Sequence, residues 1–129
     1  MRDFRKLKVW EKAHVLALDV YRNTQNFPRS EMFGLQAQMR RASVSVAANI
    51  AEGSGRSGRR ELLQFLNLAL GSASELQYHL LLARDLGLIG GHPHQVMGQR
   101  VVEVKRMLTG LSRRVRAEHQ REARLKTDD

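Results

Sequence analysis

Apolar residues between positions 62 and 83 recur at alternating steps of four and three, and this spacing limits the possible folds more than any other feature of the chain. The positions are Leu62, Leu66, Ala69, Ala73, Leu76, Leu80 and Ala83. Steps of three and four place side chains on one face of an α-helix, whereas a strand requires alternation at every second residue. The spacing therefore predicts a helix over residues 59–86, which is about 40 Å long.

Three other segments show the same helical spacing of apolar residues: residues 7–26, 33–52 and 93–118. The first stops before Pro28, because proline disfavours helical backbone in the residue that precedes it. The second closes in a glycine-rich stretch that begins at Gly53. No stretch alternates apolar and polar residues over the length of a strand. These patterns predict an all-α fold.

The length of the chain fits one domain. It has 129 residues, of which 42% are hydrophobic and 27% are charged, as in a soluble globular protein. Four helices with short connections predict an up-down-up-down four-helix bundle, which we place over residues 1–117. Residues 118–129 are polar and have no periodic apolar positions, so we expect a disordered tail there.

The predicted helix over residues 59–86 is apolar on more than one face. Besides the periodic positions given above, it carries Leu63, Phe65, Leu68, Leu70, Leu81 and Leu82. One stripe of each helix fills the core of a four-helix bundle, and apolar faces that remain are typical of subunit interfaces. We therefore expect a homo-oligomer.

Several classes of protein are disfavoured by what the sequence lacks. It contains no cysteine, which excludes disulfides, thiolate metal sites and cysteine nucleophiles. Its longest apolar run, residues 80–83, is far shorter than the ~20 residues of a membrane span. We expect a cytoplasmic protein with no membrane partner and no cofactor.

Basic residues outnumber acidic residues, and the excess is clustered. The chain has 22 lysines and arginines against 13 aspartates and glutamates, a formal charge of +9, and the excess lies in residues 1–12, 40–61 and 100–126. Such a surface attracts polyanions, so we expect nucleic acid, either RNA or DNA, as the partner. The arginines predicted to contact phosphates are Arg40, Arg41, Arg56, Arg59, Arg60, Arg113, Arg114 and Arg116. Arg106 lies on the same basic helix as the last three.

The glycine-rich stretch over residues 53–58 matches the pattern GxGxxG. A dinucleotide-binding site of this pattern follows a strand, whereas here a helix precedes the pattern. We therefore do not interpret the stretch as a dinucleotide-binding site. Flexible backbone amides, the start of the next helix and Arg56, Arg59 and Arg60 converge there, which suits a phosphate. An ordinary loop with solvated arginines is an equally good interpretation.

A set of polar residues is expected close to the core. Gln38, Ser45, Asn49 and Glu52 share one face of the predicted second helix, and Ser72 and Glu75 lie on the third. Polar groups so close to a core need partners, because each buried group left unsatisfied costs about 1–3 kcal/mol. We predict a structural hydrogen-bond network, and we keep a catalytic pair of Glu52 with Glu75 as the alternative.

The histidines do not form a metal-binding set, because His92 and His94 are two positions apart, a poor spacing for one helix face. Arg114 and His119 have four residues between them, as in the ribonuclease motif of HEPN-type helical bundles. They would diverge by roughly 140° around a helix, however. We predict no catalytic residue and no metal site, and a ribonuclease is the less favoured alternative.

Several runs of residues resemble a known family. They are Phe4-Arg5-Lys6-Leu7-Lys8-Val9-Trp10, Asn49-Ile50-Ala51-Glu52-Gly53 and Leu70-Gly71-Ser72-Ala73-Ser74-Glu75-Leu76. Over residues 4–116 the chain resembles the bacterial four helix bundle protein family, first noticed as products of intervening sequences in large-subunit ribosomal RNA genes. Gly58 departs from the family pattern, which more often has Ser or Thr three residues before the glutamate that is here Glu61. The capping box at this helix start is therefore lost.

The resemblance implies an up-down bundle that assembles into a ring-like homopentamer. Members of the family are similar to the accessory protein of diversity-generating retroelements, a basic barrel that engages nucleic acid and a reverse transcriptase. We therefore expect a non-enzymatic basic bundle that binds nucleic acid through phosphate contacts. The alternative is a protein-interaction scaffold or accessory subunit, for a reverse transcriptase or a ribonucleoprotein.

Overall fold

Four long helices follow one another in the structure, a computed structural model that describes residues 3–128. They are α1 (Lys8–Thr24), α2 (Leu35–Ser54), α3 (Arg59–Asp85) and α4 (Gly91–Asp128), and two short 3-10 turns, η1 (Phe4–Lys6) and η2 (Arg29–Glu31), precede α1 and α2. No strand occurs among the described residues. The predicted all-α four-helix fold is confirmed, and the first three helices begin and end within about two residues of their predicted limits.

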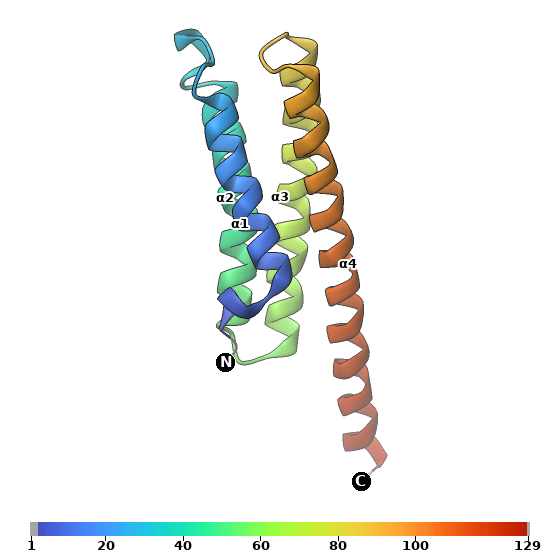
Figure 1. The fold of residues 1–129 in the computed structure, drawn as a ribbon. Coiled ribbons are helices and arrows are strands. Elements are labelled where there is room, and N and C mark those ends of the chain that lie inside the picture. The colour runs from blue at the N-terminus through green and yellow to red at the C-terminus, as the bar shows by residue number, and fades with distance from the viewer. Residues whose placement is uncertain (1–2, 129) are drawn as a thin grey trace.

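The helices form an up-down-up-down bundle. Each packs against the next along the chain, and α1 also packs against α4, so that every helix has two neighbours. Figure 1 shows the α1–α2 and α3–α4 connections at one end of the bundle, and the α2–α3 connection with the N-terminal segment at the other. The pairs α1–α2 and α3–α4 therefore form opposite sides of the bundle.

The core consists of the periodic apolar positions. All those predicted for α3, from Leu62 to Ala83, are buried, and Met97, Val101, Val104 and Leu108 of α4 face them from the neighbouring helix. In α1 the buried face includes Val9 and Leu16, while Trp10 is only half-buried and packs at the edge of the core. Within residues 3–128 no helix is both long and apolar enough to cross a membrane.

The helix α4 continues through residues predicted to be a disordered tail. It runs to Asp128 and projects beyond the end of the bundle, as Figure 1 shows. The prediction is wrong there because it relied on apolar periodicity alone, whereas arginine, glutamate, alanine and glutamine favour helix without it. Two contacts also tie this segment to α3, since Arg59 pairs with Glu118 at 3.3 Å and with Glu122. Asp129 lies outside the described residues.

Helices α2 and α3 approach each other closely at Gly53. A β-carbon placed there would lie 2.8 Å from Cβ of Phe65 and 3.2 Å from Cδ1 of Leu62. We expect Gly53→Ala to destabilise the protein by about 1–3 kcal/mol, because the overpacked helices must move apart. Thermal denaturation followed by circular dichroism measures this.

The matched control is Gly71→Ala in α3, where a β-carbon meets nothing within 4 Å. This change should stabilise the helix by about 0.5–1 kcal/mol, because alanine has less backbone freedom to lose than glycine. Equal effects of the two substitutions would show that Gly53 is not a packing position.

Candidate nucleic-acid interface

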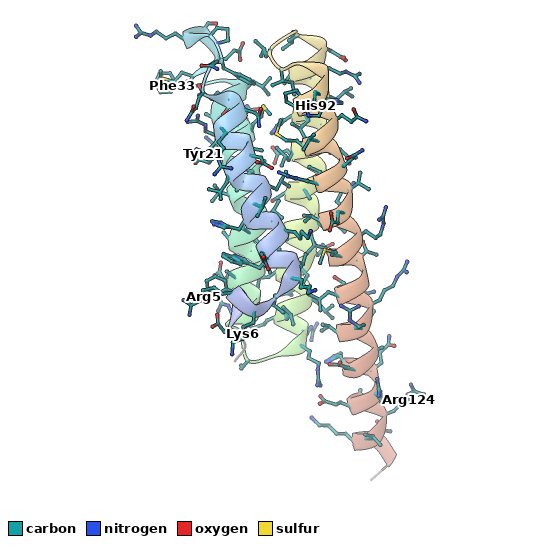
Figure 2. The ribbon with its side chains drawn as sticks, viewed as in Figure 1. Arg5, Lys6, Tyr21, Phe33, His92 and Arg124 are labelled. Carbon is teal, nitrogen blue, oxygen red and sulfur yellow. The ribbon has the colours of Figure 1, made fainter. Side chains whose placement is uncertain are left out.

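The outward face of α4 carries a line of arginines. Arg106, Arg113, Arg116 and Arg124 are all exposed, and their spacing keeps them on the side of the helix that faces away from the bundle. We call these four residues the α4 basic stripe. The stripe runs from Arg106 to Arg124, 18 positions further along the helix, or about 27 Å. Arg124 lies on the projecting part of α4 (Figure 2). It belongs to residues 118–129, for which the sequence predicts a disordered tail.

The glutamates of α4 are paired with cations of other helices. Glu103 lies 3.2 Å from Nζ of Lys12 in α1, and Glu118 and Glu122 both contact Arg59 of α3. The contact between Arg59 and Glu122 raises the pKa of the guanidinium and lowers the pKa of the carboxyl group. All glutamates of residues 100–127 therefore contact cations of α1 or α3. The charged residues on the outward face of this segment are arginines and lysine.

The remaining cations of this region have no carboxylate within ion-pair distance among the side chains described in residues 3–127. They are Arg106, Arg113, Arg114, Arg116, Arg121, Arg124 and Lys126, and all are exposed. By contrast, Arg100 pairs with Asp19 of α1, and Lys105 donates to Oε1 of Gln77 at 2.9 Å. The unpaired cations thus begin at Arg106 and continue along the projecting half of α4.

Arg40, which is predicted to contact phosphates, has its guanidinium engaged within the fold. Its Nε donates to Oγ1 of buried Thr24 at 3.0 Å, and its Nη2 donates to the carbonyl of Tyr21 at 3.3 Å. The guanidinium carbon also lies 4.6 Å from the centre of the Tyr21 ring. Arg40 therefore joins α2 to α1. Arg41 is exposed on the other side of α2, beside a small cavity that Gln38 and Glu75 also line.

The arginines of the glycine-rich turn are largely neutralised. Arg56 donates to Glu52 at 2.8 Å and lies 3.9 Å from Glu61, while Arg59 is engaged by the two glutamates of α4. The structure thus favours the ordinary-loop interpretation over a phosphate site. Arg60 is exposed. Gly58 caps α3 without a side-chain hydrogen bond, as its lost capping box predicts.

Part of the predicted polar network is present between α2 and α3. The hydroxyls of Ser45 and Ser72 are hydrogen-bonded at 2.8 Å, and Nδ2 of Asn49 donates to the carbonyl and the hydroxyl of Ser45 at 2.8 and 3.0 Å. Glu52 does not join them, since it pairs with Arg56 near the end of α2. The register set by Ser45 and Ser72 separates Glu52 from Glu75 by about 15 Å along the antiparallel helices. They do not form a catalytic pair.

His79 is a buried polar residue that the sequence analysis did not single out. It is 5% exposed, and its Nε2 lies 3.7 Å from Oε1 of Glu75. Burial lowers its pKa, and the nearby carboxylate acts in the opposite direction. The sequence does indicate a polar role for His79, because it lies seven residues after Ser72 and four residues after Glu75 and so shares their face of α3.

Arg114 and His119 lie on different sides of α4. Arg114 lines a cleft with the beginning of α1, whereas His119 lines the pocket at the α2–α3 turn together with Glu122. The two side chains therefore do not share one site, as the helical geometry predicts. In the described part of the chain, no three His, Asp or Glu residues are grouped so that they could hold a metal ion.

Two opposite sides of the bundle carry exposed apolar grooves. The α1–α2 side groups Leu18, Tyr21 and Val44, which are 40–44% exposed, over a floor of alanines. The α3–α4 side groups Tyr78, Leu81 and Val102, of which Tyr78 is 59% exposed. Of the additional apolar residues of α3, Leu81 lines the α3–α4 groove, and Leu63, Leu70 and Leu82 pack against the core. Leu68 is 54% exposed and lines neither groove.

Comparisons with known proteins agree with this architecture. A family model described as 23S rRNA-intervening sequence protein matches residues 5–110. The crystal structure of a protein of unknown function from the S23 ribosomal protein family of Bacteroides thetaiotaomicron is similar, with a TM-score of 0.73 and 24% sequence identity. The similarity covers 81% of this chain and 97% of that chain. No curated protein matches the chain.

Proposed function

Because the chain belongs to the 23S rRNA-intervening sequence protein family, we propose that it binds nucleic acid, without catalysis, through phosphate contacts of the α4 basic stripe. The observation that carries this proposal is the one-sided charge of α4. Its glutamates at 103, 118 and 122 pair with cations of α1 and α3, while the arginines of the stripe face solvent. A solvated surface that only kept the protein soluble would mix both signs.

The stripe suits a phosphate backbone better than it suits bases. A straight row of guanidiniums about 27 Å long can follow a strand, and each contact releases condensed counterions. Residues 106–124, which the stripe spans, contain no Phe, Tyr or Trp on which bases could stack. We therefore propose binding with little sequence preference. RNA is the favoured partner, since the family description refers to 23S rRNA.

The absence of catalysis is part of the proposal and is supported by the separation of the candidate groups. Glu52 and Glu75 lie far apart along α2 and α3, and Arg114 and His119 line different cavities. General acid and base groups need to reach the same substrate atoms within hydrogen-bond distance.

Self-assembly through the two apolar grooves is a further part of the proposal. The grooves lie on opposite sides, so contact between the α1–α2 side of one copy and the α3–α4 side of the next is head-to-tail and closes into a ring when the rotation permits. A ring is consistent with the homopentamer that the family resemblance implies. The same grooves favour a second candidate function, a scaffold for a partner protein such as a reverse transcriptase.

Binding without sequence preference is the expected result of the simplest experiment. Fluorescence anisotropy would compare labelled single-stranded RNAs of one length and several scrambled sequences, together with DNA of the same sequences. Affinities should agree within a factor of a few across sequences, because phosphate contacts carry no sequence information. Strong preference for one sequence, or no binding to any of them at low salt, would contradict the proposed function.

A further inference from the structure

A cleft between the beginning of α1 and α4 gathers four cationic side chains. It has a volume of about 490 Å³, and the cations that line it are Lys6, Lys8, Arg106 and Arg114. The rest of its lining is apolar or glycine: Leu7, Val9, Met107, Gly110 and Leu111. No carboxylate is part of this lining, in contrast to the pocket at the α2–α3 turn, where Glu122 faces the arginines.

None of the four cations of the cleft has a carboxylate within ion-pair distance among the side chains described in residues 3–127, although Lys6 contributes, after Arg5, to lowering the pKa of the nearby Asp3. All four are exposed, and each comes to the cleft from one of two elements that the fold brings together, the segment around η1 and α4. Nη1 of Arg114 lies 3.7 Å from the point where a β-carbon at Gly110 would sit, so the guanidinium extends across this glycine. Figure 2 shows Lys6 at the end of the bundle from which α4 projects.

We propose that this cleft binds the terminal phosphate of a nucleic-acid strand, an inference that rests on the proposed function. A phosphodiester inside a strand carries one negative charge, whereas a phosphomonoester at its end carries about −1.5 to −2 and has three strong acceptor oxygens. Four unpaired cations around one cleft match the larger charge. The apolar floor suits the base of the terminal nucleotide, and the volume lies in the range of about 300–1,000 Å³ that small-molecule sites have.

The position of the cleft is continuous with the α4 basic stripe. Arg106 belongs to both, so a strand that follows the outward face of α4 reaches the cleft at the N-terminal end of the stripe. The cleft lies on the α1–α4 side, between the two apolar grooves, and its Arg106 also lines the α3–α4 groove. Lys6, Lys8 and Arg114 line neither groove, so three of the four cations of the cleft lie outside the surfaces proposed for assembly.

The experiment compares end groups on one short RNA. Oligonucleotides of about ten nucleotides with a 5′-phosphate, a 3′-phosphate or hydroxyls at both ends would be titrated by fluorescence anisotropy, and a nucleoside 5′-monophosphate would serve as competitor. We expect a phosphorylated end to improve affinity roughly tenfold or more, because charge-assisted hydrogen bonds to the phosphate are gained. The double substitution Lys6→Gln with Lys8→Gln should remove this preference. The control Arg22→Gln with Arg29→Gln, which removes the same number of charges outside the cleft, should keep it.

The outcomes separate this inference from the proposed function. Equal affinity of wild-type protein for phosphorylated and hydroxyl ends, with binding otherwise normal, would overturn the end-binding cleft and leave the stripe intact. A preference that survives in the Lys6→Gln, Lys8→Gln variant would also overturn it. Loss of binding to every oligonucleotide would overturn both. If the mononucleotide abolishes only the extra affinity of the phosphorylated oligonucleotide, and leaves the remaining binding unchanged, the result would support the cleft. It would also show that the terminal nucleotide is sufficient for recognition there.

Discussion

Replacing Arg113, Arg116 and Arg124 by alanine is expected to weaken binding to single-stranded RNA about a hundredfold at about 0.1 M salt. Each guanidinium that contacts a phosphate releases counterions, which makes the affinity depend on salt with a slope of about 0.7 per contact for a single strand. Three lost contacts therefore remove about two decades of affinity at that salt concentration. All three side chains are exposed and lack carboxylate partners among the described residues, so the fold should be unaffected.

The matched control removes the same number of positive charges from another part of the surface. Arg22, Arg29 and Arg84 are exposed and lie toward the end of the bundle opposite to the projecting part of α4. Replacing these three by alanine should reduce affinity only a few-fold, through the weaker long-range field. Equal losses in the two triple variants would show that net charge, and not the stripe, determines binding.

The second large effect that we expect is the dissociation of the homo-oligomer when a charge is placed in one of the apolar grooves. Light scattering after gel filtration should give the wild-type protein a mass several times 14.7 kDa. The double substitution Leu18→Glu with Val44→Glu should reduce it to a monomer, because it places two charges in the apolar α1–α2 groove, where burial would leave them unpaired. The control is Leu125→Glu, since Leu125 is 62% exposed and lies outside both grooves.

Mixing variants tests whether the contact is head-to-tail. Leu81→Glu alters the α3–α4 groove and should also give a monomer. Each variant keeps one intact groove, so a mixture of the two should form a dimer of unlike variants with about twice the monomer mass if the grooves contact each other. A wild-type protein that is a monomer, a single variant that forms a homodimer through its intact groove, or a mixture that stays monomeric would contradict the proposed arrangement.

The fold could be predicted from the sequence because the apolar spacing encodes the core directly. The positions from Leu62 to Ala83 are all buried in α3, and glycine and proline mark the breaks between the helices. The end of α4 could not be predicted in this way, because it is held by helix-forming residues and by ion pairs with Arg59, not by an apolar face.

The candidate interface could be predicted only as a region of positive charge. Which arginines remain available depends on the register between helices, which one sequence does not reveal. Arg40 reaches Thr24 across α1 and α2, and Arg59 meets Glu118 and Glu122 from α3, so both are engaged inside the fold. The cleft that includes Lys6 and Lys8 likewise exists only because η1 and α4 come together.

The most direct test of phosphate recognition by α4 is the salt dependence of binding, measured for wild-type protein and for the Arg113, Arg116, Arg124 alanine variant in parallel. The logarithm of the association constant should fall linearly with the logarithm of the salt concentration, and the slope of the variant should be smaller by roughly two for single strands and up to about three for duplex DNA. Parallel lines with the same slope, or binding that is insensitive to salt, would contradict recognition of phosphates by the α4 basic stripe.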